Sequence, residues 1–131
     1  MSKANTLHAY GGEEFRAIKP SIEVNEIQSV DIRQDFAWRF QTSSKEGIRV
    51  IVEALRKAQN LSEPIVYDML GEIRLTLKRP RISSQGNFQY ICIPISPLHP
   101  ERHLGQPILD AFLKLKQMKN QGIIANEYRE D

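Results

Sequence analysis

The sequence predicts an α+β fold, with a mostly antiparallel sheet and two main helices packed on one face. Residues 15–42 are rich in β-branched and aromatic side chains that alternate over short distances, which is typical of half-buried strands. Residues 44–60 and 106–120 place apolar side chains at helical spacing, and residues 73–95 read as two strands joined by a polar turn. This order of elements fits helices on one side of an antiparallel sheet.

Length and composition indicate one folded domain. A chain of 131 residues can bury a sizeable core without metals or disulfides. Its 40% hydrophobic and 26% charged residues are ordinary for a globular protein, which argues against wholesale disorder. We expect residues 13–124 to form the domain, with residues 1–12 as a flexible N-terminal segment and residues 125–131 as a polar C-terminal tail.

Cysteine content and hydropathy point to a cytoplasmic setting. The single cysteine, Cys92, cannot form an internal disulfide, which fits a reducing compartment. No apolar run approaches the length of a membrane span, and the first residues lack the hydrophobic centre of a signal peptide. We therefore expect a cytoplasmic protein with no membrane partner.

The first strands show a clear period of two. Phe36, Trp38 and Phe40 alternate with polar or small residues, which predicts that the three aromatic rings share one face of a strand. Large aromatic side chains are usually buried, so core filling is the simplest role for this face.

Two helices follow from apolar spacing and terminal signals. Ser43 and Glu46 have the spacing of a capping box before the first helix. Pro107 opens the second helix, and Gly122 is placed where a left-handed residue would end it. The predicted buried stripes are Ile48, Ile51, Val52 and Leu55 in the first helix, and Ile108, Ala111, Phe112, Leu115 and Met118 in the second.

Residues 62–71 are ambiguous between a helix and a buried strand. We favour a helix, because Pro64 near its start and Gly71 at its end match the preferences of helix termini. Such a helix would make residues 44–71 a helix-turn-helix with the following hairpin as a wing, so a winged-helix-like domain is the second fold hypothesis. Its exposed face would be largely acidic, which disfavours reading of bases by that helix.

The hairpin over residues 73–95 has one aliphatic face and one polar face. Alternation places Ile73, Leu75, Leu77, Ile91, Ile93 and Ile95 on the core face. The same alternation puts Phe88 and Tyr90 on the other face, beside basic residues. Pro94 cannot donate to a strand ladder, so its strand should lie at a sheet edge or end there.

The basic and aromatic side chains of residues 74–90 in this hairpin predict a nucleic-acid site. Cations along a strand can follow phosphates, and aromatic faces can stack on unpaired bases at roughly 1–3 kcal/mol each, a combination that favours single-stranded DNA or RNA. The predicted site residues are Arg74, Lys78, Arg79 and Arg81 for phosphate, and Phe88 and Tyr90 for stacking. The competing interpretation is that the aromatics are buried and the basic tip is only a solvated turn.

An enzymatic function is disfavoured, and no metal or other cofactor is expected. His99 and His103 flank Glu101, but Pro100 occupies the position at which a zincin motif has its glutamate, and a third ligand is not evident. Cys92 lies within a strand with no recognisable activating partner.

The alternative to a nucleic-acid-binding protein is a protein–protein adaptor or an oligomeric structural subunit. A sheet edge or an apolar patch could bind another chain, and a homodimer is the commonest such assembly. In that case the basic tip would have no nucleic-acid role.

Overall fold

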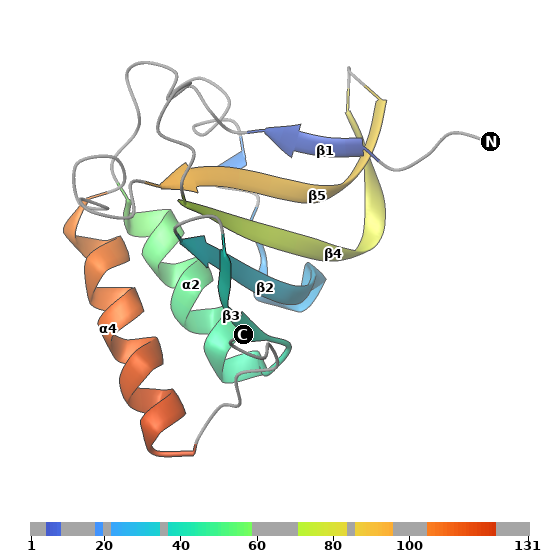
Figure 1. Ribbon diagram of the computed structural model, residues 1–131. Coiled ribbons are helices and arrows are strands. Elements are labelled where there is room, and N and C mark those ends of the chain that lie inside the picture. Colours follow the sequence, from blue (N-terminus) through green and yellow to red (C-terminus); the bar gives the residue numbers. More distant parts are fainter. Residues whose placement is uncertain are drawn as a thin grey trace.

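The computed structural model describes residues 5–8, 18–19, 22–34, 37–58, 71–83, 86–95 and 105–122. In chain order its elements are strand β1 (Asn5–His8), 3-10 helix η2 (Val24–Glu26), strands β2 (Ile27–Gln34) and β3 (Ala37–Thr42), helix α2 (Lys45–Lys57), strands β4 (Gly71–Ser83) and β5 (Gly86–Ile95), and helix α4 (Gln106–Asn120). The predicted α+β fold is confirmed (Figure 1). No helix within these ranges is long and apolar enough to cross a bilayer.

The strands form one five-stranded sheet in the order β1-β5-β4-β2-β3. Four of them, β5, β4, β2 and β3, are antiparallel neighbours, and β1 pairs parallel to β5. Strand β1 lies within residues 1–12, where the sequence analysis predicted no strand, and the division into segment, domain and tail stays a prediction. A strand of four residues is too short to show a period of two, and its partner is distant in the sequence.

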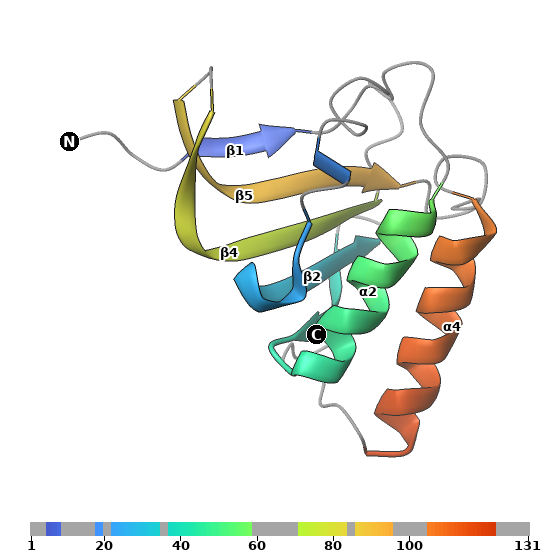
Figure 2. The same cartoon turned by 180° about the vertical axis from the view of Figure 1, so that it is seen from behind.

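Both helices lie on one face of the sheet, as predicted. Helix α2 packs against the sheet and α4 runs alongside α2 (Figures 1 and 2). The apolar residues of β4 and β5 face the helices across the core. The fully buried side chains of the core include Val30 from β2, Ile51, Val52 and Leu55 from α2, Ile73 and Leu75 from β4, Ile93 and Ile95 from β5, and Ile108 from α4.

The N-terminus of α2 differs from the prediction by one residue. Ser44, not Ser43, is the N-cap, and its hydroxyl accepts a hydrogen bond from the backbone amide of Gly47 at 3.1 Å. Thr42 accepts from the amide of Ser44 at 3.0 Å. A Cβ on Gly47 would come within 2.7 Å of the Thr42 methyl carbon, so this capping arrangement requires a glycine. The capping-box spacing fits Ser43 with Glu46 but not Ser44, which has Gly47 three residues on, so the spacing pointed to the wrong serine.

The termini of α4 agree with the prediction. Pro107 occupies the first turn, and Gly122 has a φ of 75°, the left-handed conformation expected after the helix. Ile108, Ala111, Leu115 and Met118 are buried as predicted, and Phe112 is half-buried against the same core.

A β-bulge between β2 and β3 interrupts the predicted alternation of aromatic residues. Ile32 pairs with Phe40, but the next residue, Arg33, pairs with Trp38, so one residue of β3 is skipped. Phe40 is buried in the core. The prediction that the aromatic rings share one face depended on a period of two, and the bulge interrupts that period between Trp38 and Phe40. Phe36 lies outside the described residues.

Strand β5 is not an edge strand, because it lies between β1 and β4. Its described pairing with β1 ends at Cys92, and β5 itself ends at Ile95. Pro94 still stands opposite Glu72 of β4, but it lies beyond the described pairing with β1 and next to the end of the strand, which is the second of the two predicted placements. Residues 59–70 and 125–131 lie outside the described residues, so the ambiguous segment and the C-terminal tail stay predictions, and the winged-helix hypothesis is not confirmed.

Candidate nucleic-acid interface

The hairpin of β4 and β5 extends beyond the rest of the sheet. In both cartoon views its far end curves away from the sheet, at the opposite end of the molecule from α4 (Figures 1 and 2). The tip is therefore presented on two strands only.

A large bulge in β4 forms the base of this extension. Thr76 pairs with Tyr90 and the next pair is Arg81 with Phe88, so residues 77–80 of β4 stand opposite Gln89 alone. The side-chain amide of Gln89 donates to the carbonyl of Leu77 at 3.1 Å and closes the ladder across the bulge. Leu77 remains in the core, paired with Ile27 of β2. The three following residues are forced outward, and a proline is tolerated there because no ladder bond is lost.

The bulge exposes two of the predicted cations. Lys78 and Arg79 are exposed, together with Pro80. Arg81 is half-buried and forms a salt bridge with Glu26 of η2. This ion pair ties the base of the tip to the sheet and balances one acidic charge, which leaves Lys78 and Arg79 as the outward cations of the bulge.

The structure contradicts the predicted placement of Phe88. The sequence analysis put Phe88 and Tyr90 on one polar face, but Phe88 is only 8% exposed and belongs to the hydrophobic core. Strict alternation need not hold between Phe88 and Tyr90, because the register of β5 shifts at this point against both neighbours: β4 jumps from Thr76–Tyr90 to Arg81–Phe88, and β1 passes from Thr6–Tyr90 to Asn5–Phe88. The Phe88 ring is not available for stacking on a base.

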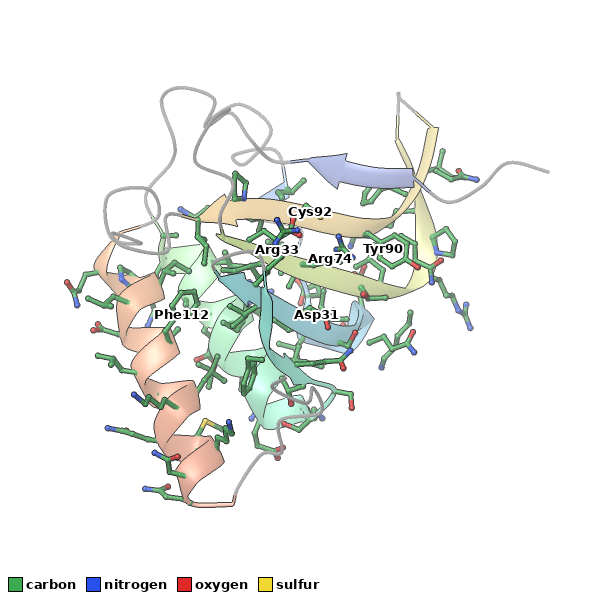
Figure 3. The ribbon with its side chains drawn as sticks, viewed as in Figure 1. Asp31, Arg33, Arg74, Tyr90, Cys92 and Phe112 are labelled. Carbon is green, nitrogen blue, oxygen red and sulfur yellow. The ribbon has the colours of Figure 1, made fainter. Side chains whose placement is uncertain are left out.

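Tyr90 and Arg74 lie on the sheet face opposite the helices. Tyr90 is 36% exposed, and Arg74 alternates with the buried Ile73 and Leu75. Figure 3 shows both side chains over the strands, with Tyr90 nearer the hairpin tip. Tyr90 therefore keeps an exposed ring edge on the same hairpin as the tip, whereas Arg74 lies farther back along β4.

Arg74 belongs to a partly buried polar cluster with Asp31, Arg33 and Cys92, which Figure 3 labels, and with Glu72. Glu72 Oε1 lies 3.6 Å from Arg74 Nη2 and 3.8 Å from Arg33 Nη1. Burial alone would lower the pKa of Arg74, but the hydrogen bond with Cys92 and the charges of Glu72 and Asp31 raise it overall. Arg74 thus serves an intramolecular ion-pair cluster, separate from the exposed cations of the tip.

Cys92 lies in the same cluster and is almost fully buried, at 1% exposure. Burial raises the pKa of the Cys92 thiol to about 11, helped by the nearby charge of Glu72 and opposed by Arg74. A thiolate is the reactive form of cysteine. The thiol is therefore neutral at physiological pH, which weighs against a nucleophilic role.

This environment predicts an unreactive thiol and a specific pH dependence. At pH 8 a thiol reagent should modify native Cys92 far more slowly than the urea-unfolded chain. Because the folded pKa lies above the ordinary value of 9.0, the unfolded state loses its proton first as pH rises. The thiol's contribution to stability should then be fully present below pH 9 and fall by about 2 kcal/mol as the pH approaches 11. Fast modification of the native protein, or equal pH profiles for wild type and Cys92→Ala, would contradict this.

The predicted absence of catalytic chemistry is not tested at His99, Glu101 and His103, which lie outside the described residues. Within the described ranges no three histidine, cysteine or acidic side chains are grouped so that they could hold a metal ion.

Sequence reasoning missed two features of the tip. Ile82 is 88% exposed, although its residue type is usually buried, and Glu26 reaches Arg81 from a segment far away in the sequence. The exposed isoleucine had a visible signal, because it directly follows "KRPR" and precedes "SSQGN", outside any aliphatic alternation. The ion pair had none, since spacing along the chain carries no information about a contact between segments so far apart.

Comparison with protein-family models, with curated proteins and with solved structures finds no match to this chain.

Proposed function

We propose that this chain is a non-enzymatic nucleic-acid-binding protein whose contact surface is the bulged tip of the β4–β5 hairpin. The observation that carries the proposal is the outward presentation of Lys78 and Arg79 by the bulge, while Arg81 is held by Glu26. Among the described residues, the acidic side chain that contacts this tip is Glu26, and Arg81 pairs with it, so we expect a positive field around the bulge that favours a polyanion.

The number of cations sets the expected strength of binding. Each phosphate contact contributes a slope of about −0.7 in log affinity against log salt for single strands and −0.9 for duplex DNA. Two outward cations therefore support modest affinity with a clear but limited salt dependence. Arg74 is committed to Glu72 and Cys92, so we place it outside the direct contact surface.

Preference for single strands is less well supported than in the sequence analysis. It depended on two stacking rings, and Phe88 belongs to the core. Tyr90 alone remains as a stacking candidate on the hairpin. Nucleic acid therefore remains the proposed partner class, and stacking alone does not decide between single strands and duplex.

The test of the proposal is binding of labelled single-stranded DNA, duplex DNA and RNA, followed by fluorescence anisotropy at several salt concentrations. The double variant Lys78→Ala/Arg79→Ala should lower the salt slope by about 1.4 for single strands or 1.8 for duplex, because it removes two phosphate contacts. The matched control is Lys116→Ala/Lys119→Ala, which removes the same charge from exposed positions on α4. Equal losses in both double variants would contradict a localised site, and no binding of wild type at low salt would overturn the proposal.

The adaptor hypothesis has one structural feature in its favour. A shallow groove separates α2 and α4, with Val50, Ala54 and Ala111 among its lining residues and Glu53, Lys57, Asp110 and Lys114 around them. A partner helix with complementary charges would fit such a groove. Loss of a protein partner on Ala54→Arg, with nucleic-acid binding absent throughout, is the result that would favour this second function. A homodimer stays a prediction.

A further inference from the structure

The most exposed large hydrophobic side chain in the described ranges is Ile82, at the tip of the proposed contact surface. Its exposed fraction is 88%, compared with 53% for Leu113 and 36% for Tyr90. Ile82 pairs across the hairpin with Asn87 and directly follows Arg81, whose salt bridge with Glu26 fixes the base of the tip. The isoleucine is thus held outward by an anchored ribbon and contributes nothing to the core.

Its neighbours define the chemistry of a partner. Lys78 and Arg79 are exposed at the bulge on the same strand, so one hairpin presents an exposed apolar side chain and two exposed cations within five consecutive residues. Both nucleic acids and anionic membranes attract such a surface. The amount of apolar surface separates them: membrane binding grows with buried apolar area, and even a single myristoyl chain gives only marginal binding. One isoleucine has far fewer carbons, so a bilayer is the weaker fit.

A single apolar side chain on a narrow ribbon is well suited to a nucleic-acid duplex. A two-stranded β-ribbon can enter a groove of the duplex. Proteins that deform DNA insert isolated apolar side chains, isoleucine among them, between neighbouring base pairs and partly unstack them. Insertion is easiest where stacking is already weak, as at a mismatch or a flexible step.

We propose that Ile82 acts as a wedge, so that the hairpin tip prefers duplex nucleic acid with an interrupted base stack over an intact duplex. This inference rests on the proposed function, because the cations bring the tip to the phosphates and the isoleucine then selects the site. Lys78 and Arg79 supply affinity without regard to sequence, and Ile82 supplies the preference for a weakened step.

The test compares an intact DNA duplex with one that differs by a single mismatch, with 2-aminopurine placed beside the mismatch. Wild type should bind the mismatched duplex about tenfold more tightly, the value expected if most of one isoleucine side chain is buried, and should raise the 2-aminopurine fluorescence as the base unstacks. Ile82→Ala should bind both duplexes like wild type binds the intact one, with no rise in fluorescence. Because Ile82 is exposed, this variant should keep the thermal stability of the wild type.

The outcomes separate the wedge from the proposed function. If Ile82→Ala keeps both the preference and the fluorescence change, or if wild type has no preference, the wedge is overturned while binding through Lys78 and Arg79 stands. If wild type binds neither duplex but binds single-stranded DNA or RNA, the wedge is overturned and the proposed function stands. If wild type binds none of these nucleic acids at low salt, both fail. Binding to vesicles of phosphatidylcholine and phosphatidylserine, lost in Ile82→Ala and without any DNA binding, would overturn both in favour of a membrane partner.

Discussion

Replacing Phe88 with alanine is expected to lower the free energy of unfolding by about 3–5 kcal/mol, the usual cost of truncating a packed phenylalanine. Phe88 is 8% exposed and lies in the same core cluster as Leu77 and Ile91. Its removal leaves a cavity beside the bulge that shapes the hairpin. Urea denaturation followed by circular dichroism measures the change directly, provided the dependence on urea concentration stays the same as in wild type.

The matched control is Tyr90→Ala, two residues along the same strand. Tyr90 is more than one-third exposed and lies on the opposite face of the sheet, so its loss should cost about 1 kcal/mol. A small effect of Phe88→Ala, equal to that of Tyr90→Ala, would show that the Phe88 ring is not packed. Phe88 would then again be a candidate for stacking on a base.

The second large effect is expected from Glu72→Ala. The Glu72 side chain is 10% exposed and lies within 4 Å of the guanidinium groups of Arg33 and Arg74. The carboxylate is mostly buried and the two guanidinium groups that it would leave behind are partly exposed, so the expected cost lies between those of an exposed and a buried ion pair, at about 1–3 kcal/mol. Thermal or urea unfolding of the variant at neutral pH measures that cost.

Glu23→Ala provides a control with a shorter but exposed ion pair. Glu23 lies 3.0 Å from Arg56, and both side chains are largely exposed. Exposed pairs contribute about 0–1 kcal/mol because water and salt screen them. If Glu23→Ala lowered the free energy of unfolding as much as Glu72→Ala, burial of the Glu72 carboxylate would not explain the contribution of its ion pairs to stability.

The sequence predicted the helices and the aliphatic core face well, because both depend on periodicity within one segment. The positions of α2 and α4, and the burial of Ile73, Leu75 and Ile93, follow from spacings of three to four and of two. Features that depend on pairing between segments were not predictable in this way. The parallel pairing of Asn5–His8 with β5 and the two bulges are set by contacts across the sheet.

The candidate site was predicted in part for the same reason. Lys78 and Arg79 were identified from composition, and both are exposed. The predicted face of Phe88 was wrong because strict alternation fails where the register shifts between Tyr90 and Phe88, and no residue in "KRPRISSQGN" marks that irregularity. The exposure of Ile82 is consistent with its place outside any aliphatic alternation, and the structure gives it as 88%.

The location of the nucleic-acid contact can be tested without any substitution. Amide chemical shifts of the labelled protein, recorded by NMR while single-stranded or duplex DNA is added, map the contact residue by residue. The account predicts that the largest changes occur at Lys78, Arg79, Arg81 and Ile82, with α4 unchanged, and that they disappear as salt is raised. Changes centred on α4 or on the α2–α4 groove, or no changes at low salt, would contradict a nucleic-acid site at the hairpin tip.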